Sequence, residues 1–262
     1  MSAFDLTGRR VLVTGGAQGL GEGMARALTA AGATVMIADV AKDLGEKTAA
    51  SVGAHFVALD VTDDAGWEAA VAQTVSELGG LDVVINNAGL EVTQLLVDTE
   101  PDDVRRLLEV NLIGTMLGIK HAFRAMRPGG PAGAGGAVIN VSSVAATIAF
   151  PSIGAYSATK SGVDRLTRIA AAESGKLGYG VRVNCLYPGL IPTAMGQKLA
   201  VETAGLGLFG SPEEAVGAVV ELTPSGRLGE VSDIADAVVF LASDASRFVN
   251  GAGLPVDGGM GM

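Results

Sequence analysis

Thr14-Gly15-Gly16-Ala17-Gln18-Gly19-Leu20-Gly21 is the stretch of sequence that decides the fold. It follows the apolar run Val11–Val13 and precedes residues 22–31, whose apolar spacing and alanine content predict a helix. A strand, a glycine turn and a helix in this order leave the first backbone N–H groups of the helix free, and glycine lets a pyrophosphate approach closely. The stretch therefore indicates a nucleotide site, although glycine turns in a chain with 38 glycines also simply reverse its direction.

Short apolar runs alternate with segments of helical length along the rest of the chain. Strands that are apolar throughout and separated by helices predict a parallel sheet with right-handed crossovers. We therefore expect an α/β fold in which residues 1–262 form a single domain, a doubly wound parallel sheet with helices on both faces. The glycine- and proline-rich residues 128–136 predict a surface loop. The expected strands are Val11–Val13, Thr34–Asp39, His55–Asp60, Leu81–Asn86, Ala137–Ser142 and Val181–Leu186.

Composition and charge narrow the class of protein. The net charge of -10 disfavours nucleic acid as a partner, because such a chain repels phosphates. No apolar run reaches the length of about 18 residues that a membrane helix needs, and the N-terminus lacks the pattern of a secretory leader. We therefore expect a cytoplasmic protein without a membrane span. The single cysteine, Cys185, and the separated histidines His55 and His121 predict neither an internal disulfide nor a metal site.

An aspartate ends the second expected strand, about 20 residues beyond the glycine turn. In that position Asp39 can bond both ribose hydroxyls of an adenosine and repel the 2′-phosphate of NADP. Neither Gln18 nor Val40 supplies a positive charge that would offset this repulsion. The sequence thus favours NAD as the cofactor. The other interpretation of Asp39 is a cap for the following helix.

Tyr156-Ser157-Ala158-Thr159-Lys160 carries the pattern that indicates chemistry. In a helix, Tyr156 and Lys160 lie one turn apart on the same face. An ammonium beside a phenol lowers the pKa of the phenol from its usual value of about 10, so the pair can take or give a hydroxyl proton. Ser143 follows the fifth expected strand and can reach the same oxygen atom. Taken alone, a serine in this place equally predicts a turn cap.

These residues, in this order and at this spacing, resemble the short-chain dehydrogenase/reductase family over essentially the whole chain. Residues 226–259 resemble the closing segment of that family. The resemblance implies a Rossmann-like fold, a nicotinamide cofactor, a small-molecule substrate, and assembly into a homotetramer or homodimer. The matching motifs are Thr14-Gly15-xxx-Gly19-x-Gly21, Asp60-Val61, Asn86-Asn87-Ala88-Gly89, Asn111, Ser143, Tyr156-xxx-Lys160 and Pro188-Gly189-xxx-Thr193.

The resemblance also implies catalytic roles. Tyr156 would be the general acid or base, and Ser143 would hold the substrate oxygen as charge develops on it. Lys160 would lower the pKa of Tyr156 and bond the nicotinamide ribose. Asn111 would support a water-linked proton path to the lysine.

The same resemblance implies how the cofactor is held. Pro192 fixes φ and removes a backbone N–H within the last motif, which makes the contacts around Thr193 less secure. The implied cofactor contacts are Gly15, Gly19 and Gly21 at the pyrophosphate, Asp39 at the adenosine ribose, Asp60 and Val61 at the adenine, Asn87, Ala88 and Gly89 at the adjoining ribose, Tyr156 and Lys160 at the nicotinamide side, and Pro188, Gly189, Ile191 and Thr193 at the carboxamide.

A long segment at about residues 190–225 follows the sixth expected strand and is expected to cover the cleft. Its apolar side chains predict an apolar substrate, and packing against a second subunit would show the same composition. The apolar positions are Leu199, Val201, Leu206, Leu208, Phe209 and 219–222.

Three functions are compatible with these observations. The favoured one is an NAD-dependent oxidoreductase that acts on a secondary alcohol or ketone of a bulky alicyclic or steroid-like skeleton. A second possibility is a reductase of 3-oxoacyl thioesters. Such an enzyme would be expected to use NADPH, which the Asp39 carboxylate disfavours. A catalytically silent NAD-sensing protein would have no need to keep Ser143, Tyr156 and Lys160 together.

Overall fold

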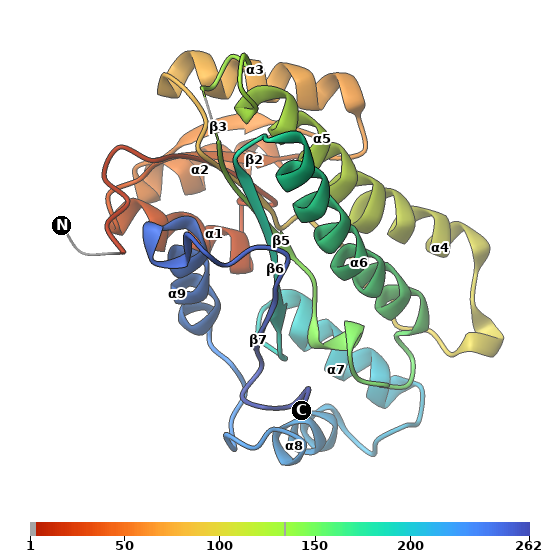
Figure 1. Cartoon of the computed structure of the whole chain (residues 1–262). Helices are drawn as coiled ribbons and strands as arrows, with labels where there is room; N and C mark the ends of the chain where they lie inside the picture. The colour runs from red at the N-terminus through yellow and green to blue at the C-terminus, as the bar shows by residue number, and fades with distance from the viewer. Residues whose placement is uncertain (1–3, 134) are drawn as a thin grey trace.

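The computed structural model describes residues 4–133 and 135–262, and in this part of the chain a seven-stranded sheet forms the centre of the molecule (Figure 1). All strand pairs are parallel, and the order is β3-β2-β1-β4-β5-β6-β7. The order reverses beside β1, so the chain winds outward in both directions, and the expected Rossmann-like doubly wound fold is confirmed. The strands are β1 (Arg10–Thr14), β2 (Thr34–Asp39), β3 (His55–Ala58), β4 (Val83–Asn86), β5 (Gly136–Val141), β6 (Val181–Pro188) and β7 (Gly253–Val256).

The sequence predicted six of these strands, with ends that differ by one or two residues in most cases. β7 was not predicted because it is short and carries Pro255, which cannot donate to a ladder. It pairs only with β6 and so lies at the edge of the sheet, where a proline is tolerated. The loop predicted at 128–136 is present as turns over 128–133, and Gly136 already belongs to β5.

Helices cover both faces of the sheet (Figure 1). The alternation along β1 shows why: Val11 and Val13 pack with α1 and α9 on one face, and Leu12 packs with α3 and α5 on the other. Both faces are therefore buried, which explains strands that are apolar throughout. The α-helices are α1 (Gly19–Ala30), α2 (Lys42–Val52), α3 (Asp64–Leu78), α4 (Pro101–Leu107), α5 (Gly114–Met126), α6 (Gly154–Leu177), α7 (Ala194–Gly205), α8 (Pro212–Glu221) and α9 (Val231–Ala242).

Short helices of other types complete the connections. A π-helix (Leu108–Ile113) joins α4 to α5, and 3₁₀ turns occupy Leu96–Asp98, Val144–Ala146 and Asp244–Ser246. π-Helical turns are rare and often lie at functional sites. Within the described residues, no helix combines the length and the apolar character that a membrane crossing requires.

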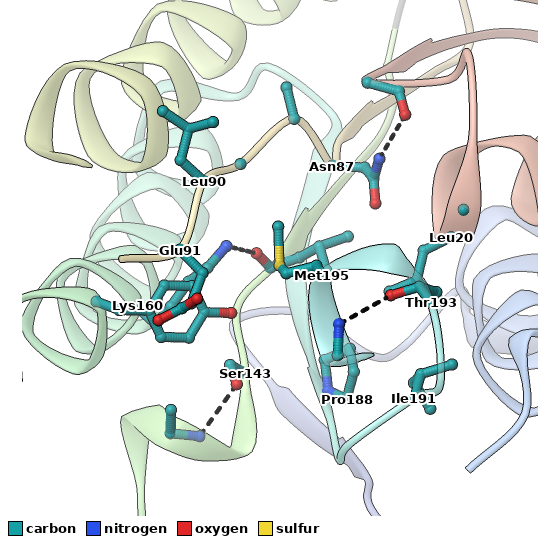
Figure 2. Close-up of a pocket in the computed structure, with 18 of the residues that line it drawn as sticks. Leu20, Asn87, Leu90, Glu91, Ser143, Lys160, Pro188, Ile191, Thr193 and Met195 are labelled. Atoms are coloured by element: carbon teal, nitrogen blue, oxygen red, sulfur yellow. Dashed lines mark hydrogen bonds between the residues drawn. The ribbon is translucent and has the colours of Figure 1, made fainter. Parts of the chain in front are cut away.

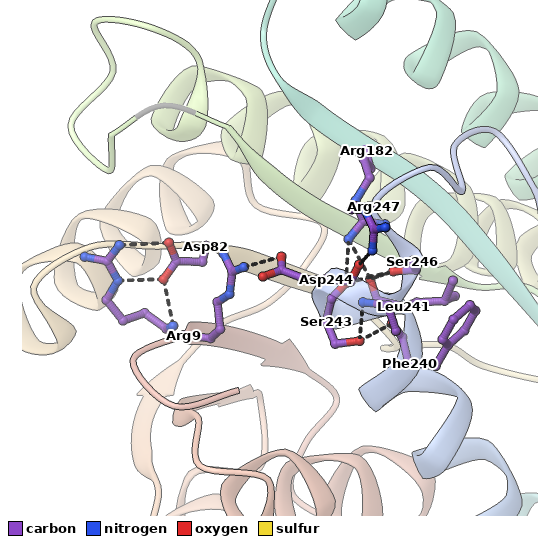
Figure 3. A network of polar contacts seen from close by, with 11 residues as sticks. Arg9, Asp82, Arg182, Phe240, Leu241, Ser243, Asp244, Ser246 and Arg247 are labelled. Carbon is purple, nitrogen blue, oxygen red and sulfur yellow. Dashed lines mark hydrogen bonds and ion pairs between the residues drawn. The ribbon is translucent and has the colours of Figure 1, made fainter. Parts of the chain in front are cut away.

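A polar network ties the amino ends of the central strands to the end of α9 (Figure 3). Asp82 receives two hydrogen bonds from the Arg10 guanidinium, at 2.7 and 2.8 Å, and the pair is mostly shielded from water. Arg9 pairs with Asp244, and Arg182 donates to the carbonyl oxygen of Leu241 at 2.9 Å. The Arg182 contact satisfies a carbonyl at the end of α9. All of these contacts lie at the amino ends of the strands, at the opposite edge of the sheet from the site described next.

Candidate active site

A cleft of about 660 Å³ lies along the carboxyl ends of the strands. This is the edge at which doubly wound sheets bind ligands. Figure 2 shows how the loops after β4, β5 and β6 bring their side chains to it. The sequence-predicted site residues that line the cleft are Gly15, Gly19, Gly21, Asp39, Asp60, Val61, Asn87, Ala88, Gly89, Ser143, Tyr156, Lys160, Pro188, Gly189, Ile191 and Thr193.

The glycine turn is packed against the loop after β4. The Asn87 amide donates to the carbonyl oxygens of Thr14 and Gly15, at 2.9 and 3.1 Å, and the Thr14 hydroxyl accepts the backbone N–H groups of Asn87 and Ala88. A Cβ on Gly21 would overlap the Gly15 carbonyl oxygen. Gly21 is thus required for helix–turn packing, and Gly19, at φ 60°, for the left-handed backbone.

The amino end of α1 fits the phosphates of a dinucleotide. Its N-cap residue, Gln18, makes no side-chain hydrogen bond to the helix. The first N–H groups of a helix have no partner within it and carry the positive end of the helix dipole. Gln18, Gly19, Leu20 and Gly21 all line the cleft, so these N–H groups face the space in which an anion would lie.

Asp39 lines the cleft at the end of β2 and is held in place by the backbone. Its Oδ2 accepts the N–H of Ala17 at 3.0 Å, and its Oδ1 accepts the N–H of Ala41 at 2.9 Å. Ala41 is the N-cap residue of α2, so the helix-capping interpretation also describes a real contact. The two contacts fix the carboxylate, whose remaining lone pairs are free for a ligand.

Asp60 and Val61 follow β3 and reach the same end of the cleft. The Asp60 carboxylate accepts both the N–H and the hydroxyl of Thr62, at 2.9 and 2.8 Å. These contacts hold it in the cleft beyond β3, which β2 and β1 separate from β4, and therefore far along the sheet from Tyr156. The arrangement separates an acidic end of the cleft from a catalytic end.

Ser143 and Tyr156 meet at the catalytic end. Ser143 leaves β5 at the start of a 3₁₀ turn, where its Oγ accepts the N–H of Ala145 at 3.1 Å. The Ser143 hydroxyl also lies near enough to the Tyr156 phenol to lower the pKa of that phenol. Tyr156 lies in the first turn of α6, which Ser152 precedes with a left-handed φ of 73°. That strained residue sets the entry into α6 and therefore the direction of the phenol.

Lys160 lies one turn after Tyr156, as predicted, and its Nζ is 5.6 Å from the centroid of the Tyr156 ring. The predicted lowering of the Tyr156 pKa is not found: burial raises the pKa of this phenol to about 12, and only Ser143 opposes the effect. Lys160 is itself buried, which lowers its pKa to about 8, and its Nζ donates to the carbonyl oxygen of Val141 at 2.9 Å. In this structure the Lys160 ammonium is therefore hydrogen-bonded to the backbone of β5 and not to the Tyr156 phenol.

Asn111 does not line the cleft. It lies fully buried in the π-helix, where its amide donates to the carbonyl of Leu90 and to the hydroxyl of Thr159, and its Oδ1 accepts the N–H of Leu90. It thus joins the loop after β4 to α6 behind the catalytic side chains. Its place in a proton path remains a prediction from the resemblance.

The loop after β6 closes the cleft beside the glycine turn. The N–H of Gly189 donates to Val256 in β7, and the N–H of Thr193 donates to the carbonyl oxygen of Ile191 at 2.7 Å across Pro192. The Thr193 hydroxyl caps α7 by accepting the N–H of Gly196 at 3.4 Å. The proline thus tightens the turn and leaves Thr193 with defined contacts.

Apolar side chains surround the rest of the catalytic end. The segment at 190–225 forms α7 and α8, and Phe209 stacks on Phe150 at 6.5 Å between ring centroids. Leu199 and Val219 line the cleft as expected, whereas Val201 and Leu222 are exposed. Sequence reasoning missed other apolar lining residues, which adjoin the motifs but carry no pattern of their own: Ile148, Phe150, Met195 and Met260.

The cysteine and the histidines lie outside this site. Cys185 is buried in β6, the His121 ring contacts Asp64 at 2.7 Å, and His55 contacts Glu77 at 3.2 Å. Across 4–133 and 135–262, no three His, Cys, Asp or Glu residues lie where they could hold a metal ion.

Comparison with known proteins agrees with this geometry. A family model described as enoyl-(acyl carrier protein) reductase matches residues 15–261. The trans-4-hydroxycyclohexanecarboxylate dehydrogenase of Sinomonas cyclohexanicum is 39% identical over 95% of this chain and 91% of its own length. The 3-alpha-(or 20-beta)-hydroxysteroid dehydrogenase of Mycobacterium tuberculosis is 37% identical over 97% of this chain and 90% of its own.

A solved structure shows the same architecture. The crystal structure of a candidate short-chain alcohol dehydrogenase from Sinorhizobium meliloti superposes with a TM-score of 0.86 at 34% identity, and covers 99% of this chain and 98% of its own. Sequence, fold and the arrangement of Ser143, Tyr156 and Lys160 therefore lead to one assignment. The chain belongs to the short-chain dehydrogenase/reductase family.

Proposed function

We propose that this protein is an NAD-dependent oxidoreductase that interconverts a secondary alcohol and a ketone on a bulky alicyclic or steroid-like skeleton. The observation that carries the proposal is the cleft itself. Ser143 and the Tyr156 phenol meet at one end of it beneath an apolar wall formed by α7 and α8, and Asp39 lies at the other end. The chain's family supports chemistry at a CH–OH group.

The proton transfer follows from the state of the phenol. A nicotinamide, when bound, supplies or accepts the hydride. Because the pKa of Tyr156 is about 12, the phenol is protonated near neutral pH and can donate its proton to a ketone oxygen. The Ser143 hydroxyl donates to the same oxygen as negative charge develops on it. In the reverse direction, Tyr156 takes the proton of the alcohol once it has lost its own.

Asp39 supports NAD over NADP. Its fixed carboxylate would accept the ribose hydroxyls and would repel a 2′-phosphate in the same place. Val40, the next residue, is apolar and 68% exposed, so it offers no compensating charge. The NADP-dependent (R)-specific alcohol dehydrogenase of Lentilactobacillus kefiri, 36% identical over 97% of this chain, shows that relatives differ in this respect.

Substrate size is supported by the lining of the catalytic end and by the relatives. Ile148, Phe150, Met195 and Leu199 offer apolar surface to a carbon skeleton. Two of the relatives described above act on a substituted cyclohexane and on hydroxysteroids by name. A third, the borneol dehydrogenase of Lavandula x intermedia, is 38% identical over 97% of this chain.

The test is reduction of a panel of ketones with NADH and NADPH in parallel, with Tyr156→Phe as control. The panel holds cyclohexanone, decalone, a 3-ketosteroid and a 3-oxoacyl thioester. Turnover of the cyclic ketones with NADH that disappears in Tyr156→Phe supports the proposal. Faster turnover of the thioester with NADPH establishes the second function considered above. Binding of NADH without any turnover establishes the NAD-sensing function instead.

Assembly and location belong to the same proposal. We infer a homodimer or homotetramer of a cytoplasmic enzyme. Large apolar side chains are exposed along the π-helix and α5, namely Leu108, Ile113 and Met116. Covering them against a second copy would remove apolar surface from water. Light scattering after size-exclusion chromatography tests the assembly, and a monomer would contradict it.

A further inference from the structure

Glu91 is the polar side chain at the catalytic end that the proposed chemistry does not use. It lies two residues after Gly89 on the loop that follows β4 and lines the cleft. Figure 2 draws it together with Lys160 and Ser143 among the residues that line the cleft. Its negative charge raises the pKa of Tyr156, which places its carboxylate within electrostatic reach of the reacting group.

The Glu91 carboxylate has one oxygen satisfied and one free. Oε1 accepts the hydroxyl of Thr93 at 2.9 Å, whereas Oε2 has no hydrogen-bond partner among the described residues. Glu91 lines the cleft but is only 8% exposed, so bulk water hydrates its carboxylate poorly. A buried carboxylate oxygen without a donor is costly, and an apolar residue would fill the same space without that cost.

The groups around Glu91 act on its carboxyl in opposite directions. Burial raises the pKa of Glu91 and Glu202 adds to the rise, whereas the hydrogen bond from Thr93 and the nearby Lys198 ammonium oppose it. Lys198 lies on α7, where it pairs with Glu202 at 3.3 Å and donates to the backbone carbonyl of Glu91 at 3.4 Å. Neither Lys198 nor Glu202 lines the cleft, so the acceptor that a ligand meets is Glu91.

The other charged residues of the cleft have different places. Asp39 and Asp60 follow β2 and β3, at the acidic end, and both already accept two hydrogen bonds from the chain. Lys160 donates to Val141. At the catalytic end, Glu91 is therefore the carboxylate that lines the cleft, and its Oε2 has no donor among the described residues.

We propose that Glu91 forms a substrate subsite that accepts a hydrogen bond from a second hydroxyl group, so that the enzyme prefers hydroxylated cyclic ketones, or the corresponding diols, and rejects carboxylated ones. The inference rests on the proposed function, because it requires the ketone to react at Tyr156. A hydroxyl donor satisfies Oε2, whereas a substrate carboxylate brings a second negative charge to it. A hydrogen bond to a charged acceptor corresponds to a preference of about 10-fold or more.

The test compares kcat/KM for matched ketones in wild type, Glu91→Gln and Glu91→Leu. The substrates are cyclohexanone, its 2-, 3- and 4-hydroxy derivatives, and 4-oxocyclohexanecarboxylate. The wild type is expected to favour at least one hydroxyketone over cyclohexanone by about 10-fold and to disfavour the carboxylate. Within each variant, the ratio of kcat/KM for the hydroxyketone to kcat/KM for cyclohexanone is expected to fall to about 1, whatever the variant does to turnover as a whole, and Glu91→Gln is expected to accept the carboxylate better.

Glu202→Gln is the matched control. It removes the same charge from the same cluster but does not line the cleft, so the hydroxyl preference is expected to survive. Calorimetric binding of the ketones to Tyr156→Phe with NADH present gives the comparison without turnover.

No hydroxyl preference in the wild type, an unchanged preference in Glu91→Gln, or an equal loss in Glu202→Gln would overturn the inference and leave the proposed function intact. No turnover of any ketone would overturn both.

Discussion

Replacing Lys160 by methionine is expected to make the protein more stable at neutral pH while it abolishes activity. Lys160 is 4% exposed, and burial lowers its pKa from 10.5 to about 8. The folded state therefore binds this proton less tightly than the unfolded state does. Between about pH 8 and pH 10.5 the unfolded chain holds more protons, so stability rises with pH across that window.

The magnitude follows from the same shift. At pH 7 the cost of burying the ammonium is about 3 kcal/mol, and at pH 10 it falls to about 1 kcal/mol. The lysine offsets part of it by donating to the carbonyl oxygen of Val141, a bond worth about 1 kcal/mol. Lys160→Met has a similar volume and no charge. We therefore expect it to gain about 2 kcal/mol at pH 7, or about 4–8 °C in Tm, and nothing at pH 10.

The assay is thermal and urea unfolding of both proteins at pH 7 and pH 10. Lys176→Met is the control, because Lys176 is an exposed lysine at the end of the same helix, α6. Its small effect should be alike at both pH values. A Lys160→Met variant that is less stable than wild type at pH 7, or a gain that does not shrink at pH 10, would refute the reasoning.

Three further changes test the site. Asp39→Asn is expected to raise the affinity for NADPH relative to NADH by about 100-fold. At an effective dielectric of about 20, the repulsion between a carboxylate and a nearby phosphate costs several kcal/mol of binding free energy. Fluorescence titration measures both affinities, and an equal shift in Asp60→Asn would contradict the prediction. Tyr156→Phe is expected to lower kcat by about 10²–10⁴-fold with NADH affinity kept, as steady-state kinetics and titration would show. Gly21→Ala is expected to cost about 1–3 kcal/mol in urea unfolding, because its methyl group meets the Gly15 carbonyl oxygen; an unchanged unfolding midpoint would disprove that packing.

The fold could be predicted because its information is local. Each of the first six strands is a short apolar run that a turn or a helix bounds, and periodicity detects such runs. Strand β7 was not predicted because its four residues include a proline. It forms by pairing with the edge of β6. Its existence depends on a tertiary contact that no local pattern encodes.

The site could be predicted only as far as its motifs reach. Most of the predicted residues line one cleft, since the ends of parallel strands meet at one edge of the sheet. The pKa of Tyr156 could not be predicted, because it depends on how deeply the phenol is buried and on which atom Lys160 contacts. Glu91 was missed for a similar reason: nothing in the sequence marks which residue after Gly89 turns into the cleft.

Three polar groups around the catalytic end, two of them predicted from the sequence, share one physical property that links stability to activity. Asn111, Lys160 and Glu91 are polar side chains buried around the catalytic end, where each needs a partner to offset its desolvation. Asn111 has partners within the fold, Lys160 has a single one, and Glu91 keeps one oxygen without any. The low dielectric that makes their burial costly also strengthens each interaction they make with a ligand. The fold therefore gives up stability at the catalytic end of the cleft, where Lys160 has one hydrogen-bond partner and one oxygen of Glu91 has none among the described residues.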